Sequence, residues 1–304
     1  MTSSFNTVGL IGRRGTPAIR DSLDSVLKLL LARSVNVIVE DDTAAMMGNS
    51  SRKEQRRHDR APRLELGERA DLIVVVGGDG SLLGVGRDLA HCGVPVVGVN
   101  RGGLGFLADI SPEQIEVSLT EVLEGRFRAE DHFLLHARIR RSGEVVAGSP
   151  ALNDVVVHLG GMARMMEFSL WVDDEFVYDQ RSDGLIIASP TGSTAYALSA
   201  GGPIMHPSLD AIVVVPMFPH TLTSRPLVIR GQSEIRVAVG SSEPEPRVSC
   251  DSQVNFMLEP GDEVLVSKYA TPLKLLYPLD HSFYGSCRSK LDWASRLGGS
   301  AAPE

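Results

Sequence analysis

A short run of glycines around one aspartate is the first feature of the sequence that could carry out chemistry. Gly77-Gly78-Asp79-Gly80-Ser81 follows an apolar run and precedes a segment with helical spacing. Glycine lets the backbone approach a phosphate group closely, and free amides at a helix N-terminus attract anions. Because the Asp79 carboxylate repels phosphate, it indicates either a turn residue that accepts backbone hydrogen bonds or a base beside a phosphoryl acceptor. The run alone supports both interpretations about equally.

The sequence excludes three common motifs. A dinucleotide fingerprint requires a small residue where Leu83 stands, and a P-loop requires Gly-Lys-Ser/Thr, which is absent here. A nucleophile elbow is excluded because Ala195 occupies the place of the second glycine in Gly-x-Ser-x-Gly. We interpret residues 189–196 as a backbone cradle instead.

Other small, polar clusters recur along the chain. Residues 100–107, with the sequence Asn-Arg-Gly-Gly-Leu-Gly-Phe-Leu, follow an apolar run that ends at Val99. Ligands in open α/β folds bind at the carboxyl ends of the strands, so this cluster should lie at the same sheet edge as residues 77–81. Asn153-Asp154 precedes another strand-like run, and so does Arg181-Ser182-Asp183-Gly184, in which Asp-Gly is by default a turn.

The order and spacing of these clusters resemble the motifs of bacterial NAD kinases over roughly residues 70–280. The resemblance implies transfer of the γ-phosphoryl group of ATP to the 2′-hydroxyl of the adenosine ribose of NAD, which gives NADP. It also implies a divalent cation and a homo-oligomer, usually a tetramer or dimer. The matching motifs are Gly77-Gly78-Asp79-Gly80, Asn100-x-Gly102-x-x-Gly105-Phe106, Asn153-Asp154, Ser182-Asp183-Gly184, residues 191–196 (Thr-Gly-Ser-Thr-Ala-Tyr) and Gly201-Gly202-Pro203.

The resemblance also implies roles for individual residues. Asp79 would accept or orient the ribose hydroxyl proton, and Asn153 with Asp154 would bind NAD hydroxyls. Asp154 stands where many members have Glu, and Ser252 where many have Gly, which leaves their detailed contacts open. The residues expected to bind NAD or ATP are Gly78, Gly80, Asn100, Phe106, Asn153, Asp154, Arg164, Arg181, Asp183, Ser193, Thr194, Ala195, Tyr196, Ala197, Leu198, Ser199 and Gln253.

Phosphoryl transfer agrees with this set, because it depends on positioning and charge neutralisation more than on a covalent nucleophile. Mg²⁺ usually arrives on the nucleotide phosphates with most of its waters, so no side chain is expected to ligate the metal. The histidines, including His158 and His220, show no ligand spacing and are expected to be structural or surface residues.

Two other classes of function remain open. Lipid kinases and phosphofructokinase-like enzymes resemble the chain at Gly-Gly-Asp-Gly, although the Asn153-Asp154 and 191–196 clusters favour a dinucleotide acceptor. A non-catalytic nucleotide sensor could keep every glycine, but the intact Asp79 favours an enzyme.

The segments that would hold these residues predict an α/β N-terminal domain with a parallel sheet. Residues 8–11 form an apolar run, and Thr16-Pro17 offers an N-cap and a first-turn proline for a helix. Apolar residues at 19, 23, 26, 27 and 30 form one stripe before the β-branched run 35–39. A strand buried on both faces at 72–76, a helix at 81–90 and a strand at 94–99 follow.

From about residue 132 the chain changes to short β-like runs, which predict a β-rich C-terminal domain. Residues 284–297 regain helical spacing, and we expect this helix to return to the first domain. The expected domains are therefore a nucleotide-binding domain over 1–128, with 279–304 packing back on it, and an NAD-binding domain over 129–278. The expected strands cover residues 133–139, 155–158, 166–172, 175–178, 185–188, 212–215, 227–229, 234–239, 247–249, 254–258, 263–266 and 273–277.

Composition limits the partners and the compartment. The 304 residues carry a net charge of −8, which argues against coating nucleic acid by neutralising phosphates. Three widely spaced cysteines and the absence of a signal sequence or a long apolar span favour a cytoplasmic protein without a membrane role. The basic residues 51–60 indicate a solvated loop, or less readily a flap that meets phosphates. Tyr196 and the apolar residues 212–218 could lie at a subunit contact, although 212–218 suits a buried strand equally well.

Overall fold

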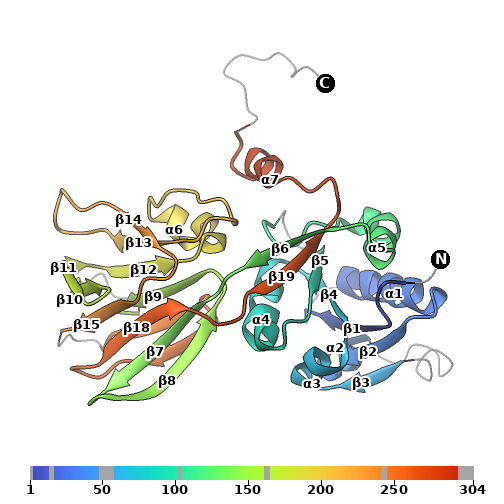
Figure 1. Ribbon diagram of the computed structural model, residues 1–304, viewed down its shortest axis with the longest axis horizontal. Coiled ribbons are helices and arrows are strands. Elements are labelled where there is room, and N and C mark those ends of the chain that lie inside the picture. Colours follow the sequence, from blue (N-terminus) through green and yellow to red (C-terminus); the bar gives the residue numbers. More distant parts are fainter. Residues whose placement is uncertain are drawn as a thin grey trace, which may run out of the picture. The chain divides into compact units, whose positions relative to one another are not determined.

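The computed structural model describes residues 3–13, 17–47, 58–101, 105–160, 165–240 and 245–293. The chain divides into two compact units, which are coloured along the sequence in Figure 1. The first unit comprises Met1–Leu82, Val94–Glu130 and Leu275–Glu304, and the second comprises Leu83–Gly93 and Asp131–Lys274. Three separate stretches of chain therefore build the first unit.

A seven-stranded sheet forms the centre of the first unit, in the order β3-β2-β1-β4-β5-β19-β6. The pairs β1–β2, β1–β4, β2–β3, β4–β5 and β5–β19 are parallel, which confirms the predicted α/β domain with a parallel sheet. The strands are β1 (Thr7–Gly12), β2 (Asn36–Glu40), β3 (Asp59–Ala61), β4 (Leu72–Gly77), β5 (Val96–Asn100), β6 (Arg128–His132) and β19 (Leu273–Tyr277).

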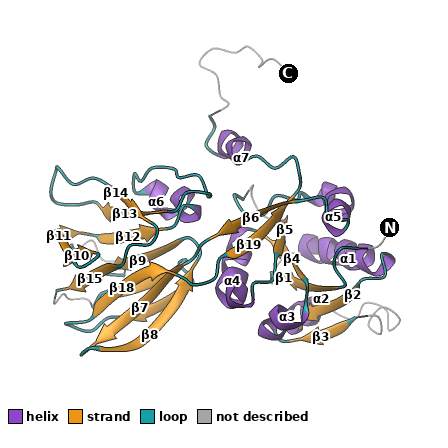
Figure 2. Ribbon diagram, viewed as in Figure 1, coloured by secondary structure: helices purple, strands orange, loops and turns teal. Residues whose placement is uncertain are grey.

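Helices cover both faces of this sheet (Figure 2). The predicted stripe of α1 is buried together with side chains of α5 and one face of the strands. On the other face, Leu66 of α3 packs at Gly9, and Leu82 of α4 packs at Gly98. Sandwiched in this way, β4 is buried along its whole length, as its continuous apolar run predicted. The helices are α1 (Pro17–Ala32), α2 (Asp41–Met47), α3 (Arg63–Arg69), α4 (Asp79–Leu89), α5 (Ile115–Leu123) and α7 (Phe283–Lys290), with 3₁₀ turns η1 (Ala90–Cys92) and η2 (Pro112–Gln114).

The second unit contains two six-stranded antiparallel sheets, in the orders β11-β10-β15-β18-β7-β8 and β14-β13-β12-β9-β16-β17. Alternate side chains from both sheets form one shared hydrophobic core, which confirms the predicted β-rich domain. The outer face of β12 and β13 is also buried, against α6 (Tyr196–Ser199). The strands are β7 (Leu135–Arg141), β8 (Glu144–Ala151), β9 (Asp154–His158), β10 (Met166–Val172), β11 (Glu175–Ser182), β12 (Gly184–Ala188), β13 (Ala211–Met217), β14 (Leu227–Arg230), β15 (Ile235–Val239), β16 (Arg247–Cys250), β17 (Val254–Met257) and β18 (Glu263–Lys268).

Several features differ from the sequence-based prediction. The run 273–277 was expected in the β-rich domain, but β19 pairs in parallel with β5, with Leu275 opposite Val96. A short apolar strand fits the middle of either kind of sheet, so its sequence does not say which one it joins. The strand β8 was not predicted because it contains Gly148 and Pro150, which are rare in strands and tolerated here at a sheet edge. Residues 83–93 cluster with the second unit, since Gly86 of α4 lies against Leu152 and Leu273.

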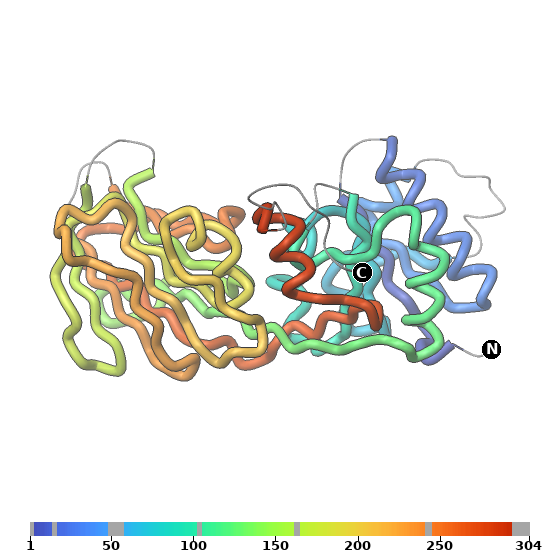
Figure 3. Tube along the Cα trace, turned by 90° about the horizontal axis from the view of Figure 1, so that it is seen from above, coloured from blue at the N-terminus to red at the C-terminus, as the bar shows by residue number. Residues whose placement is uncertain are grey.

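The C-terminal helix returns to the first unit as expected (Figure 3). It is shorter than predicted, because α7 ends at Lys290 and residues from 294 onward lie outside the described part of the chain. The Ser282 side chain caps α7 by accepting a 3.1 Å hydrogen bond from the Gly285 amide. His281 approaches Asp109 at 2.9 Å, and the Phe283 ring lies 6.4 Å from that of Phe106.

Several smaller expectations can be compared with the described residues. Asp173 and Asp174 form the β10–β11 turn with positive φ angles, and Gly261 also lies in a turn, as predicted. Residues 51–57 of the basic segment lie outside the described residues, while Asp59 and Arg60 belong to β3. All three cysteines are free thiols. None of the described helices is long and apolar enough to cross a membrane.

Candidate active site

Asp79 is the first residue of α4, and its carboxylate is held by the backbone of the next motif. Oδ2 accepts a hydrogen bond from the Phe106 amide at 2.6 Å, and Oδ1 accepts from the amides of Leu107 and Ala108 at 3.1 and 3.2 Å. The clusters at 77–81 and 105–107 therefore meet at the carboxyl ends of β4 and β5, as predicted. Both interpretations of Asp79 stay compatible, because a carboxylate that organises a loop can also face a substrate.

The glycines near Asp79 differ in how closely they are packed. A Cβ at Gly105 would lie 1.8 Å from Asp79 Oδ1, and a Cβ at Gly77 would lie 2.3 Å from Ser81 Oγ, so close packing accounts for both glycines. A Cβ at Gly78 would have no atom within 4 Å. Packing therefore leaves Gly78 unexplained, whereas close approach of a ligand to its backbone would explain it.

Lys290 of α7 brings a positive charge to this region, which the sequence did not indicate. Its Nζ lies 3.8 Å from the centroid of the Phe106 ring and has no hydrogen-bond partner in the described part of the chain. Burial lowers the pKa of Lys290 to about 8, and the charges of Asp79 and Asp109 act in the opposite direction. No local motif marks this lysine, because only the folding back of the C-terminus brings it near Asp79.

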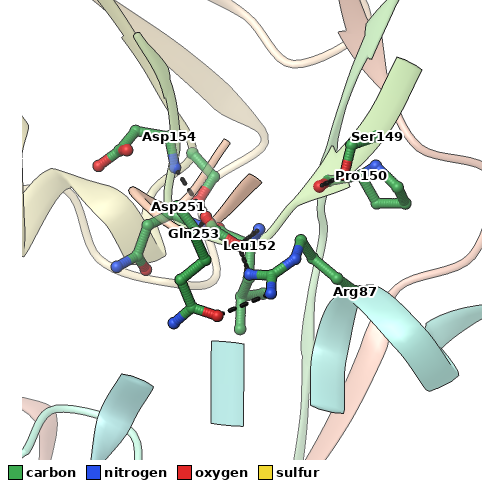
Figure 4. A network of polar contacts seen from close by, with 9 residues as sticks. Arg87, Ser149, Pro150, Leu152, Asp154, Asp251 and Gln253 are labelled. Carbon is green, nitrogen blue, oxygen red and sulfur yellow. Dashed lines mark hydrogen bonds and ion pairs between the residues drawn. The ribbon is translucent and has the colours of Figure 1, made fainter. Parts of the chain in front are cut away.

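The second unit holds the Asn153-Asp154 cluster in a network centred on Asp251 (Figure 4). The Asp251 carboxylate accepts hydrogen bonds from the amides of Leu152, Asn153 and Asp154 at 3.0, 2.8 and 3.3 Å. Arg87 Nη1 donates to Asp251 at 3.1 Å, and Arg87 Nη2 donates to Gln253 Oε1 at 2.7 Å. Three residues expected to bind substrate, Asn153, Asp154 and Gln253, thus share one network.

Asp154 itself lies in an unusual electrostatic environment. Its side chain is buried, and Oδ1 has no hydrogen-bond partner within the described residues. Burial, and then the charge of Asp251, raise the pKa of Asp154 to about 7. Burial also raises the pKa of Asp251, but that carboxylate has four hydrogen-bond donors that favour its charge. Of the two carboxylates, Asp154 is therefore the one that favours protonation near neutral pH.

The cradle at 189–199 folds as the 3₁₀ turn η3 (Thr191–Thr194) followed by α6. Ser189 joins it to the Asn153 cluster, because its hydroxyl donates to the Leu152 carbonyl at 2.5 Å and its amide to the Asn153 carbonyl at 2.9 Å. A Cβ at Gly192 would lie 2.0 Å from the Asn153 carbonyl oxygen. The hydroxyl of Ser193, an expected binding residue, is buried and bonded to the Pro190 carbonyl at 2.6 Å and the Met205 amide at 2.9 Å.

Asp183 and Tyr196 line a hollow of about 430 Å³ on the second unit. His158, which was expected to be a structural or surface residue, also lines this hollow, and its Nδ1 accepts the Gly160 amide at 3.0 Å. Burial, and then the charge of Arg247, lower the pKa of His158. Only the pairing of neighbouring strands brings this set together, so sequence spacing could not reveal it. The remaining lining residues are Val156, Leu159, Gly160, Met217, Ser249, Ser252 and Asn255.

Arg181 faces a different hollow from Asp183. It lies with Glu167 and His220 along a hollow of about 530 Å³, and its Nε is 3.1 Å from a carboxylate oxygen of Glu167. The side chains of Arg181 and Glu167 are both more than 60% exposed, so this ion pair is weak. The other expected arginine, Arg164, lies outside the described residues.

The structure also places further residues that were expected to bind NAD or ATP. Asn100 ends β5 with its side chain buried, and Gly80 lies in the first turn of α4. Ala197 is buried in the core beneath α6, whereas Ser199 and Tyr196 are exposed. Among the described residues, no group of three or more His, Cys, Asp or Glu side chains could hold a metal ion.

Two family models match the chain in succession. The ATP-NAD kinase N-terminal domain matches residues 8–127, and the ATP-NAD kinase C-terminal domain matches residues 152–277. The chain belongs to the NAD kinase family. The predicted resemblance is therefore confirmed, and the motifs described above lie within the matched regions.

Relatives agree with this assignment over nearly the whole chain. The chain is 52% identical to the NAD kinase of Pseudomonas fluorescens (strain SBW25) and 52% identical to that of Ectopseudomonas mendocina (strain ymp). Each comparison covers 97% of this chain and 98% of the relative.

Two solved structures are similar at lower identity. Yeast NADH kinase complexed with NADH has a TM-score of 0.86 and 27% identity, and the match covers 97% of this chain and 90% of that one. An NAD kinase from Archaeoglobus fulgidus in complex with ATP has a TM-score of 0.73 and 26% identity, covering 93% of this chain and 99% of that one.

In this NAD kinase, we expect Gly192→Ala to lower both thermal stability and NADP formation. The new Cβ would overlap a backbone oxygen, which cannot move aside like a flexible side chain, so a loss of about 1–3 kcal/mol is expected. Gly78→Ala is the matched control, because its Cβ meets no atom, and its Tm should equal that of the wild type. Thermal unfolding of both variants tests this, and a wild-type Tm for Gly192→Ala would contradict it.

The raised pKa of Asp154 predicts a pH-dependent stability difference. The native state favours the protonated acid up to about pH 7, whereas the unfolded chain ionises near the ordinary value of 3.8. The contribution of Asp154 to stability is therefore lost progressively as the pH rises from about 4 through 7. Asp154→Asn cannot ionise, so it should gain on the order of 1–2 kcal/mol relative to wild type between pH 5 and 8. If the free energies of unfolding of the two proteins change in parallel with pH, the pKa of Asp154 is not raised in the native state.

Proposed function

We propose that the chain transfers the γ-phosphoryl group of ATP to the 2′-hydroxyl of the adenosine ribose of NAD, giving NADP. The observation that carries this proposal is Asp79 at the start of α4, in a chain about 50% identical to bacterial NAD kinases over almost its full length. The yeast relative is complexed with NADH and the archaeal relative with ATP, which fits one nucleotide donor and one dinucleotide acceptor. Incubation of the purified protein with ATP, Mg²⁺ and NAD, followed by detection of NADP, is the direct test.

Asp79 is proposed as the residue that accepts or orients the ribose hydroxyl proton. Each carboxylate oxygen offers about two lone-pair directions, and Oδ2 accepts one hydrogen bond, from Phe106, among those found in the described chain. Oδ2 therefore retains a position for the substrate hydroxyl. The three amides hold the carboxylate in one orientation, so little reorganisation is needed when the substrate arrives.

The binding roles follow the same division of the chain. We assign ATP binding to residues 1–128 with 279–304, where Gly78, Gly80, Asn100 and Phe106 lie, and NAD binding to residues 129–278. In the NAD-binding part, Asn153, Asp154, Asp183, Gln253 and residues 193–199 would contact the dinucleotide, with the hollow at Asp183 and Tyr196 as one subsite. Arg164 and Arg181 are the basic residues assigned to the dinucleotide phosphates.

Mg²⁺ is the proposed divalent cation. It prefers oxygen ligands and keeps several waters, so the ATP phosphates with few protein contacts can hold it. When bound, the ion neutralises charge on the phosphates. The carboxylate oxygens of Asp79 are hard ligands of the kind that this ion prefers.

The three cysteines are free thiols, which fits the reducing cytoplasm that we propose as the location of the enzyme.

Asp79→Asn should reduce kcat by about 10²–10⁴-fold, because the variant lacks the group that accepts the ribose proton. Its Tm should also fall, since an amide NH₂ cannot accept the backbone hydrogen bonds that the carboxylate accepts. Asp71→Asn is the control: the Asp71 carboxylate likewise accepts two backbone amides, from Asn6 and Thr7, but belongs to no motif. Steady-state rates of the two variants, measured below both of their melting temperatures, distinguish a catalytic from a structural role of Asp79. Near-normal turnover of Asp79→Asn would mean that Asp79 is only a structural residue.

We further propose a homo-oligomer built on the second unit. Residues 212–217 are buried within β13, so they do not form a contact surface, but the β13–β14 hairpin exposes large apolar side chains. Phe218 is 74% exposed, Leu222 91% and Val228 50%. Such a group of side chains on one hairpin is suited to contact a second copy of the chain.

Leu222→Asp should convert the oligomer to smaller species, as measured by light scattering at micromolar concentration. Val117→Asp, at a 66% exposed position of α5 in the first unit, is the control and should leave the mass unchanged. A wild-type protein that is monomeric and fully active would refute the oligomer.

A further inference from the structure

We propose that Asp251 and Arg87 are positioning residues that shape the Asn153-Asp154 cluster and orient Gln253 for NAD. Neither is among the residues expected to bind substrate, and the proposal rests on the function proposed above. It deepens that function by naming side chains that act through the binding residues.

The first argument is the convergence of backbone amides. Three successive N–H groups, of residues 152–154, point at the Asp251 carboxylate, whose side chain is fully buried. Successive amides converge on one anion only in a particular backbone conformation, so the carboxylate selects that conformation of the loop. In return, the Asp251 amide donates to the Asp154 carbonyl at 2.9 Å, so contacts run in both directions.

The second argument is the geometry of the turn that carries Asp251. Asp251 and Ser252 have φ angles of 52° and 55°, in the left-handed region that non-glycine residues seldom adopt. The turn joins β16 and β17, and Gln253 is its last residue. Hydrogen bonds to the Asn153 loop and to Arg87 offset the strain of this turn.

Arg87 links the Asp251 carboxylate to the Gln253 side chain, as Figure 4 shows. One guanidinium nitrogen binds Asp251 and another binds Gln253, and the side chain is only 10% exposed. Because arginine can only donate, this contact fixes the Gln253 amide with its oxygen toward Arg87. The guanidinium also neutralises the buried Asp251 charge, which would otherwise be costly.

The third argument concerns charge at Asp154. Among the described residues, the titratable groups that act on each other here are Asp154, Asp251 and the Cys250 thiol, and the Arg87 guanidinium contacts Asp251. Of these, Asp251 opposes ionisation of Asp154. An uncharged residue at 251 should therefore shift ionisation of Asp154, and any step that depends on it, to lower pH.

The test compares Asp251→Asn with a matched buried pair in the same unit. Asp262, with a side chain 1% exposed, binds Arg141 at 2.8 Å and accepts the Glu259 amide at 2.8 Å, but contacts none of the expected binding residues that the structure describes. We expect Asp251→Asn to raise the KM for NAD about tenfold or more, with the KM for ATP changed less than about threefold. Asp262→Asn should lower Tm without changing either KM.

Two further measurements test the proposal, and the first of them, on Arg87 variants, keeps it testable even if Asp251→Asn does not fold. Arg87→Gln should raise the KM for NAD selectively, and Arg87→Lys should restore it only in part, because lysine lacks the fork that reaches both acceptors. The pH midpoint of kcat/KM for NAD should also move downward in Asp251→Asn. The proposal is overturned if the Asp251 and Arg87 variants, like Asp262→Asn, lose only stability. Wild-type NADP formation tests the proposed function separately.

Discussion

One interaction occurs twice among the residues that the structure describes, and both candidate binding regions depend on it: a carboxylate that accepts three successive backbone amides. Asp79 holds residues 106–108 in the first unit, and Asp251 holds residues 152–154 in the second. A carboxylate withdrawn from water is tolerated only when donors replace its hydration. The loops that supply these donors are thereby held in one shape, and they carry the family motifs.

This constraint explains much of the glycine pattern. Gly105 and Gly192 are required because a neighbouring motif lies where a Cβ would be, whereas a Cβ at Gly78 would meet open space. A glycine that the sequence suggests for phosphate binding can therefore be required instead because two loops pack closely against each other at that position. The two roles of a glycine can be distinguished only when the structure shows which residues lie next to it.

The sequence predicted the architecture well where local periodicity decides it. The stripe of α1, the buried strand β4 and most strands of the second unit follow from their own residues. The placement of β19 does not follow from its own residues, because the sheet that it joins depends on strands far away in the sequence. In the candidate site, Asp79, Asn153 and Asp154 were recognisable as motifs. Lys290, Arg87 and the acceptor role of Asp251 were not, since each acts through a fold contact between segments far apart in the chain.

The position of β19 has a consequence for how the chain acquires its structure during synthesis. This strand lies between β5 and β6 but is translated after almost the entire second unit. Until then a nascent chain has β5 as an open sheet edge, and β6 lacks its neighbour. The first unit, although it begins at the N-terminus, can close its sheet only near the end of translation. Its folding is therefore dominated by non-local pairing, which is slow and leaves intermediates exposed to aggregation. A released chain ending before residue 273 should accordingly resemble a completed second unit attached to an unfinished first one.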